Sequence, residues 1–210
     1  MIVRAKHNLF MYKFFKLYTV YKIRSNFQNV LLKGEFEERG LPVLLISNHV
    51  SWWDGFWAEY LNLKVFKRKY FYFMMLEEQL AKNRFLNFTG GFSIRKKSKS
   101  IIETLNYTAE LLADNRNLVL IFPQGEIQSL YNDSIEFSKG LEFILKKISG
   151  NIQLIFLVSL IDYFSGRNPS LYMYFREYSE DDHSIRAIEN SYRLFYSQCR
   201  SGNIELNRST

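Results

Sequence analysis

The stretch LPVLLISNHVSWWDGFW, residues 41–57, joins a short apolar run of strand type to an aromatic run of helical type. Residues 43–47 predict a buried strand, and residues 52–62 predict the helix that follows it. His49 and Asp54 lie at this junction, with four residues between them. Because α/β proteins place their sites where strands end at the carboxyl edge of the sheet, this junction is the first candidate for a site.

The remainder of the chain repeats this alternation of strand-like and helix-like segments. The alternation predicts an α/β fold with a single domain, a central and mostly parallel sheet flanked by helices, and an N-terminal basic amphipathic helical segment. The other expected strands are 70–75, 118–122, 152–159 and 171–176. The other expected helices are 77–88, 98–114, 138–148 and 184–200.

Length and composition agree with one globular domain. A chain of 210 residues can close one substantial core, and 47% hydrophobic with 23% charged residues is typical of globular proteins. Aromatic residues reach 17%, more than such a core can hide, so we expect some to contact lipid, an acyl chain or a partner. The single cysteine, Cys199, excludes an internal disulfide and a multi-cysteine metal site. No stretch reaches the roughly 18 consecutive apolar residues of a spanning helix.

The positive charge of the chain is concentrated at its N-terminus. Residues 1–34 hold seven basic residues and no acidic one, whereas residues 35–210 hold 21 of each, so the whole net charge of +7 lies in the first segment. Such a helix can lie in a bilayer interface, or it can dock on the protein's own core. Five apolar residues at helical spacing predict the apolar face of this helix: Phe10, Phe14, Leu17, Tyr18 and Tyr21.

His49 and Asp54 admit a structural and a functional interpretation. Ser51 and Asp54 have the spacing of a capping box, in which the serine caps a helix and the acid reaches back, and His49 is then only a polar loop residue. In the functional interpretation the Asp54 carboxylate bonds one nitrogen of His49, and the other nitrogen accepts a proton from an attacking hydroxyl. Taken alone, the pair favours the structural interpretation.

Two later stretches place further polar groups near expected strand ends. GGFSIRKK, residues 90–97, sets two glycines before a burst of cations, which suits close approach to an anion or an ordinary turn beside a solvated basic patch. IFPQGEI, residues 121–127, ends an apolar strand in a sharp turn that leaves Gln124 and Glu126 at the sheet edge.

The order and separation of these motifs are more specific than any one of them. N-H-x-S-x-x-D, then Gly-Gly-Phe-x-Ile-Arg, then Phe-Pro-x-Gly resembles the motif series of the glycerolipid acyltransferase superfamily, which includes 1-acylglycerol-3-phosphate acyltransferases. FSKG, residues 137–140, resembles the helix start that follows in that superfamily. The resemblance covers roughly residues 40–160 and implies an acyltransferase domain over residues 35–210.

The resemblance implies an O-acyltransferase of lipid metabolism, with a role in phospholipid biosynthesis. His49 would be the general base and Asp54 its orienting partner, as an acyl group passes from acyl-CoA or acyl carrier protein to a lipid hydroxyl such as that of a lysophospholipid. It implies no bound cofactor and no metal, with the acyl thioester as co-substrate. The residues implied to bind the acceptor are Arg95 or Lys96 for its phosphate, with Phe122, Pro123, Gln124, Gly125 and Glu126 from the third motif.

The third motif departs from the superfamily's Phe-Pro-Glu-Gly-Thr-Arg. Gln124 replaces the glutamate and keeps its size without its charge, while Ile127 replaces an arginine that would donate to a phosphate. Glu126 adds a negative charge that would oppose a phosphate. A glycolipid or aminolipid acceptor is therefore an alternative, and so is a catalytically silent member that binds lipid or membrane.

These features predict partners and location. We expect a membrane surface, a lipid acceptor and acyl-CoA or acyl carrier protein as partners, and a cytoplasmic protein held peripherally on the inner face of the cell membrane. The high isoelectric point, about 9.3, raises nucleic-acid binding as a third possibility. Because the excess charge is confined to residues 1–34 and no nucleic-acid motif is present, we expect no nucleic-acid partner.

Overall fold

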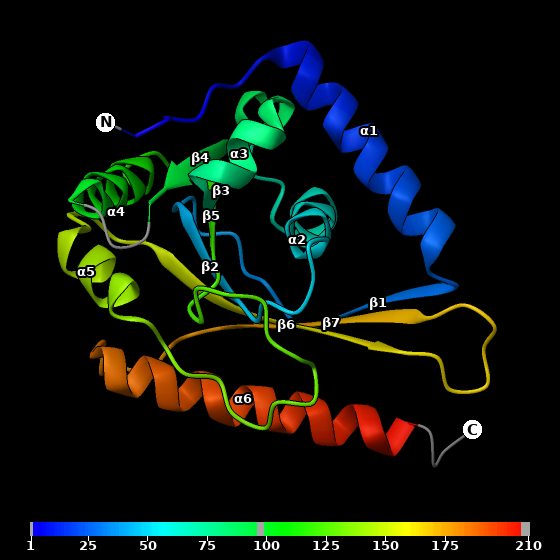
Figure 1. Cartoon of the computed structure of the whole chain (residues 1–210). Coiled ribbons are helices and arrows are strands. Elements are labelled where there is room, and N and C mark those ends of the chain that lie inside the picture. Colours follow the sequence, from blue (N-terminus) through cyan, green and yellow to red (C-terminus); the bar gives the residue numbers. More distant parts are fainter. Residues whose placement is uncertain (1, 96–98, 207–210) are drawn as a thin grey trace.

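The fold is built around one seven-stranded sheet. A computed structural model describes residues 2–95 and 99–206, with strands in the order β1-β7-β6-β2-β5-β3-β4 (Figure 1). Strands β2 to β6 run parallel, while β1 and β7 run the opposite way at one edge. The strands are β1 (Asn29–Lys33), β2 (Val43–Ser47), β3 (Tyr70–Leu76), β4 (Gly91–Ile94), β5 (Asn117–Ile121), β6 (Gln153–Asp162) and β7 (Ser170–Glu177).

Helices cover both faces of this sheet. The first three α-helices pack with one hydrophobic cluster and the last three with the other, and Figure 1 shows α6 on the opposite side of β6 and β7 from α1 and α2. The α-helices are α1 (Leu9–Asn26), α2 (Asp54–Leu61), α3 (Glu77–Lys82), α4 (Ser100–Leu111), α5 (Lys139–Lys147) and α6 (Ile185–Leu206). Two short elements follow α2 and α3: the π-helical η1 (Asn62–Phe66) and the 3-10 helix η2 (Arg84–Phe88).

The central strands explain why the predicted fold class is confirmed. Every residue of β2 and β5 is buried, and Leu44 and Ile46 join one core cluster while Val43 and Leu45 join the other. A strand buried on both faces reads as a continuous apolar run, which is the pattern that predicted it. All five expected strands are present, and their boundaries agree to within a few residues.

Two strands were not expected from the sequence. β1 is a short strand that pairs parallel with β7 at one edge, and β4 pairs with β3 at the other. The glycines before and within β4 suggested a turn. Gly90 instead has a φ of 111°, and a Cβ there would collide with the Phe71 carbonyl oxygen, so glycine lets β4 approach β3 closely.

The N-terminal strap, residues 2–8, covers the β4 edge. The backbone N–H of Val3 donates to Ser93 Oγ at 2.8 Å, and Ser93 N–H donates to the Val3 carbonyl at 3.0 Å. Farther along, Lys6 N–H donates to the Asn87 carbonyl at 2.8 Å. An open strand edge can pair with another chain, and the strap occupies this one.

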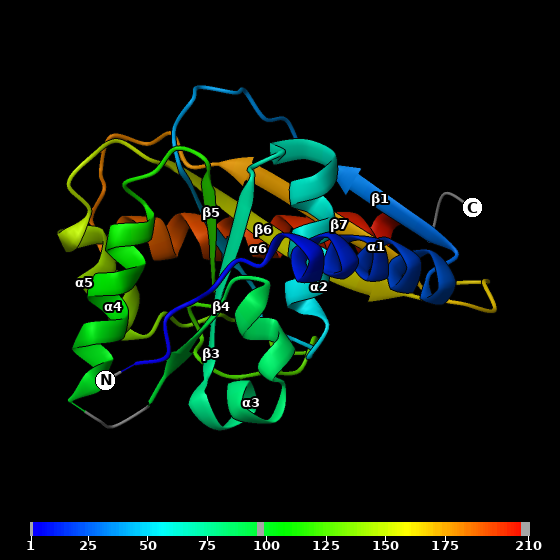
Figure 2. The same cartoon turned by 90° about the horizontal axis from the view of Figure 1, so that it is seen from above.

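Helix α1 follows the strap and lies on the same side of the sheet as α2 (Figures 1 and 2). Asn8 caps it, because its side-chain oxygen accepts from the N–H groups of Phe10 and Met11 at 3.1 Å each. The face that docks on the protein differs from the apolar face identified in the sequence, for which membrane contact and docking on the core were both open. The buried residues are Tyr12, Phe15, Thr19 and Ile23, whereas Phe10, Phe14, Leu17 and Tyr21 of the predicted face are exposed.

Buried titratable groups lie on both sides of Tyr12. The imidazole of His7 is 4.8 Å from the Tyr12 ring and 4.8 Å from the Tyr72 ring, centroid to centroid, and burial lowers its pKa to about 4, with help from the charge of Lys16. Glu59 of α2 is fully buried, and burial raises its pKa to about 7. On the other face of the sheet, burial raises the pKa of the Cys199 thiol in α6 to about 12.

Candidate active site

The candidate site is the loop between β2 and α2. The first residue of this loop is anchored to the neighbouring strand β6. Asn48 is fully buried, and its amide donates to the Ser159 carbonyl at 3.0 Å while its side-chain oxygen accepts from Ser159 N–H at 2.8 Å. This pair of bonds joins the first residue after β2 to the neighbouring strand β6. The loop that carries His49 is therefore fixed at the carboxyl end of β2, where the sequence placed it.

His49 and Asp54 are in direct contact. Nδ1 of His49 lies 2.8 Å from Oδ2 of Asp54, and the His49 side chain is 21% exposed while that of Asp54 is 1% exposed. A carboxylate accepts at Nδ1 only from the N–H tautomer, so Nε2 then carries the lone pair. Among the described residues, none hydrogen-bonds Nε2. Nε2 is thus the nitrogen able to accept a proton from a bound molecule.

The same carboxylate oxygen also starts helix α2. Asp54 Oδ2 accepts from the backbone N–H of Val50 at 2.7 Å and of Ser51 at 2.9 Å. The Ser51 hydroxyl accepts from Trp53 N–H at 3.1 Å. Ser51 was expected to cap the helix, but the N-cap residue of α2 is Trp53, two residues later. The structural and functional interpretations are therefore not exclusive, because one carboxylate bonds both the loop backbone and the imidazole.

Burial controls the electrostatics of Asp54. Desolvation raises the pKa of this carboxyl, and the bonds from His49, Ser51 and Val50 oppose that increase. Oδ1 is buried and has no hydrogen-bond partner among residues 2–95 and 99–206. A poorly solvated carboxylate beside an imidazole gains most when the ring becomes a cation, because the two charges then compensate each other in a medium of low polarity.

The turn after β5 closes over His49. The Phe122 ring stacks on the imidazole, with centroids 4.0 Å apart and planes 11° apart. Gln124 Oε1 accepts from His49 N–H at 2.7 Å, and Gln128 N–H donates to the His49 carbonyl at 2.8 Å. The two glutamines also bond each other, because Gln124 Nε2 donates to Gln128 Oε1 at 2.6 Å. We call Gln124 and Gln128 the glutamine clamp.

The rest of the third motif builds this turn. Gly125 N–H donates to the Phe122 carbonyl at 3.1 Å, and Gly125 has a φ of 73°, a conformation that favours glycine. Pro123 is buried, and its carbonyl accepts from Ser138 N–H at 2.8 Å at the start of α5. Glu126 and Ile127 are exposed beyond the turn.

Arg95 lies on the same edge of the sheet as His49 but farther along it. It follows β4, which is three strand positions from β2, or roughly 14 Å at about 4.8 Å per strand. Its guanidinium forms a two-bond ion pair with Glu77, at 2.7 Å from Nε and 2.5 Å from Nη2. Lys96, the alternative cation in the sequence analysis, lies outside the described residues.

Sequence reasoning missed two groups that hold the site. Asn48 is part of the first motif, but no role was predicted for it from the sequence. Its position beside His49 was the only sequence feature that pointed to it. Gln128 gave no signal, because it is 79 positions from His49 and meets it only through the fold. Within the described part of the chain, no three His, Cys, Asp or Glu side chains gather as a metal site would require.

The family model described as Acyltransferase matches residues 24–157, which contain the loop, both members of the His49–Asp54 pair and the glutamine clamp. A search of curated proteins returned no match. Of the helices that the structure describes, none has the length and apolar character needed to cross a membrane.

Proposed function

The chain belongs to the acyltransferase family, and on that premise we propose that it transfers a fatty acyl group from an acyl thioester to a lipid hydroxyl. The donor is acyl-CoA or acyl carrier protein, and the acceptor class is that of a lysophospholipid or a similar hydroxylated lipid. The observation that carries the proposal is the 2.8 Å contact between His49 Nδ1 and Asp54 Oδ2. It supports a base whose second nitrogen, Nε2, has no hydrogen-bond partner among the described residues.

The proposed reaction has two proton transfers on one histidine. Nε2 of His49 removes the proton of the acceptor hydroxyl while the oxygen attacks the thioester carbonyl. The buried Asp54 carboxylate stabilises the imidazolium that forms. When the tetrahedral intermediate collapses, the carbon–sulfur bond breaks and the imidazolium returns the proton to the departing thiolate. The products are an ester and a free thiol, and no protein nucleophile is needed.

The charges around the edge favour an acceptor without a phosphate as a second candidate. The guanidinium of Arg95 is already paired with Glu77. Glu126 and Ile127 occupy the two third-motif positions where the superfamily resemblance has threonine and arginine. A phosphate at Arg95 would have to displace a carboxylate that makes two charge-assisted bonds. A glycolipid or aminolipid needs no such exchange.

A thiol-release assay tests the function and the acceptor together. Purified protein is mixed with long-chain acyl-CoA or acyl carrier protein and with lysophospholipids, glycolipids or aminolipids in turn. We expect release to require one acceptor class and to fall by roughly 10²- to 10⁴-fold in His49→Ala, since a positioned base contributes about that much. His183→Ala is the matched control, because His183 is exposed and contacts Tyr178 rather than the site.

The possible outcomes of this assay are distinct. Equal release by His49→Ala and the parent protein would reject the pair as the catalytic machinery. No release from folded protein with either donor and every acceptor would favour the silent, lipid-binding member. Preference for a glycolipid or aminolipid over lysophospholipids would establish the second candidate.

A further inference from the structure

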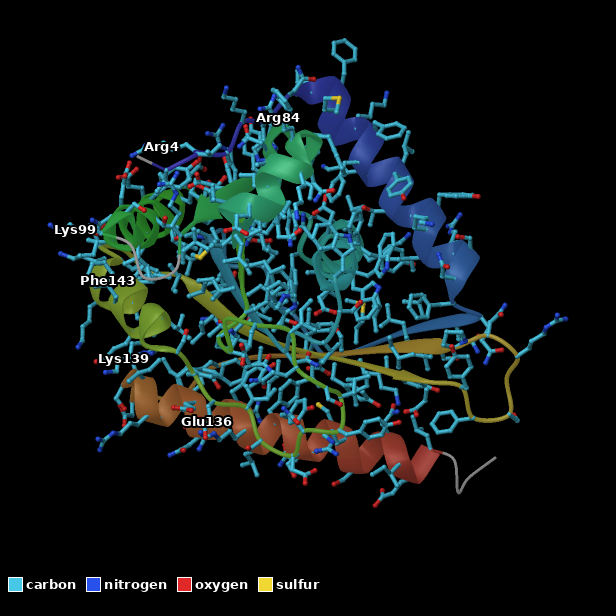
Figure 3. All side chains as sticks on the ribbon, in the orientation of Figure 1. Arg4, Arg84, Lys99, Glu136, Lys139 and Phe143 are labelled. Carbon is cyan, nitrogen blue, oxygen red and sulfur yellow. The ribbon has the colours of Figure 1, made fainter. Side chains whose placement is uncertain are left out.

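Helix α1 has an exposed aromatic stripe on the side that faces away from the protein. We define the stripe as Phe10, Phe14, Leu17 and Tyr21, which are 85%, 63%, 64% and 66% exposed. Figure 3 shows side chains projecting from the outer side of α1 into the surroundings. An exposed apolar surface of this kind marks a site of protein or membrane contact.

The stripe is separate from the face by which α1 docks. At 100° per residue, positions 10, 14, 17 and 21 fall roughly opposite positions 12, 15, 19 and 23, which are the buried ones. Tyr12 and Ile23 are buried on the docking face, and the outer aromatics lie outside it. Such an exposed apolar face is available to a partner surface.

The charges beside the stripe restrict that partner. Lys13 and Arg24 are exposed on its flank, and residues 1–34 contain no acidic side chain. A second copy docked on the same stripe would bring two positive segments together, which is unfavourable. A bilayer with anionic headgroups satisfies both parts of the surface, because rings enter the acyl boundary while lysine and arginine meet the headgroups.

Aromatic contacts continue from the stripe to the candidate site. Phe14 stacks near Tyr18 with centroids 6.2 Å apart, Tyr18 meets Phe56 at 6.1 Å, and Phe56 meets Trp53 at 5.0 Å. The ammonium of Lys22 on α1 lies 5.3 Å from the Trp53 ring centroid. Trp52 and Trp53 are 41% and 36% exposed, and they occupy the loop between His49 and Asp54.

We infer that the aromatic stripe, Trp52 and Trp53 form one docking surface for an anionic lipid bilayer. Docking places α1 in the interfacial plane and sets the loop of His49 at the level of the headgroups, where a lipid hydroxyl would be presented. The protein is then peripheral, held by rings that enter about 5–10 Å and by cations outside them. This inference concerns location and orientation, and it does not depend on the proposed reaction.

Vesicle sedimentation tests the surface directly. The probes are vesicles of phosphatidylcholine alone and of phosphatidylcholine with phosphatidylglycerol, without acyl donor or acceptor. We expect the parent protein to bind the anionic vesicles in a salt-sensitive manner, and Phe10→Ser with Phe14→Ser to reduce partitioning at least about tenfold. Leu194→Ser with Ile204→Ser is the matched control, because these α6 residues are 58% and 60% exposed on the other face of the sheet.

Tryptophan fluorescence tests whether the site loop joins the surface. The chain has three tryptophans, of which Trp57 is 3% exposed, so quenching by brominated lipid reports on Trp52 and Trp53. Quenching of the bound parent protein supports the orientation, and binding without quenching rejects it. Failure of the parent protein to bind, or equal binding by the Phe10/Phe14 variant, overturns the surface. Conversion of a dimer to a monomer by that variant would assign the stripe to a second copy instead.

Failure of this inference can be told apart from failure of the proposed function. The Phe10/Phe14 variant should retain thiol release with an acceptor dispersed in detergent micelles, because its substitutions do not touch His49. His49→Ala should show the reverse, with vesicle binding intact and thiol release lost.

Discussion

The side-chain amide of Gln124 is held at both ends by the protein itself. Its oxygen accepts from the His49 backbone and its nitrogen donates to Gln128, so both ends of the amide are used before any acceptor arrives. The resemblance placed Gln124 among acceptor-binding residues. The contacts indicate a positioning residue instead, which fixes the backbone on which the imidazole stands.

Replacement of Gln124 by alanine distinguishes these two roles. Gln124→Ala leaves the His49 N–H without its acceptor and the imidazole less well positioned, so we expect kcat to fall about tenfold with little change in the acceptor KM. Steady-state kinetics with varied acceptor measures both constants. An unchanged kcat with a raised KM would instead show that the amide binds the acceptor. Gln128→Ala, which removes the other half of the clamp, should reproduce the smaller kcat.

Local spacing was enough to find the His49–Asp54 pair, but not the groups around it. His49 and Asp54 are close in the chain and lie at a strand-to-helix junction, so the sequence alone brings them into reach. The ion pair between Arg95 and Glu77 and the contact of Gln128 with His49 depend on how separate segments meet in the fold. No local pattern encodes such meetings.

At the scale of elements, the packing of the strap, α1 and α2 buries two titratable groups near Tyr12 that have opposite pH responses. The pKa of Glu59 is about 7 in the folded protein against an ordinary value of 4.5, so the folded state is increasingly disfavoured as pH rises from 4.5 to 7. The pKa of His7 is about 4 against 6.5, so the folded state is increasingly disfavoured as pH falls from 6.5 to 4. Each effect amounts to roughly 3 kcal/mol at full extent.

We therefore expect the parent protein to change little in stability between pH 4.5 and 6.5, where the two slopes oppose each other. Glu59→Gln should lose stability as pH falls through this range, and His7→Phe should gain it, by roughly 1–3 kcal/mol in each case. Urea unfolding at several pH values measures this. The His7 ring nitrogens have no hydrogen-bond partner among the described residues, so phenylalanine removes the titration without removing such a bond. Parallel pH profiles for all three proteins would contradict the assignment.

Elements with a continuous apolar run were predictable, and those with mixed signals were not. The strands β2, β5 and β6 are largely buried on both faces and were predicted from their apolar runs. Strand β4 instead follows Gly90, the glycine that its approach to β3 requires. Helix α1 was expected, but two apolar faces compete in its sequence. Hydrophobic periodicity identified the face that is exposed in the structure. Periodicity shows that an apolar face exists, but it does not show whether that face packs on the protein.

At the scale of the whole molecule, the N-terminal strap covers the β4 edge of the sheet, which would otherwise be open. We expect deletion of residues 2–7 to lower stability by about 2–3 kcal/mol, because it removes the buried Ile2 and the backbone bonds to Ser93 and Asn87. The exposed β4 edge should then cause concentration-dependent self-association. Thermal unfolding and size-exclusion chromatography measure the two effects, with Lys6→Ala as the control. A monomer of unchanged Tm would show that the strap is dispensable.

The burial of Cys199 makes the folded protein unreactive toward thiol reagents. Its thiol lies in the core beneath α6, and burial holds its pKa near 12, so almost no thiolate is present at neutral pH. A colorimetric reagent added during turnover will therefore count only the thiol that leaves the donor. Once α6 separates from the sheet, the same cysteine reacts. The rate at which Cys199 is labelled therefore measures how often that side of the protein opens.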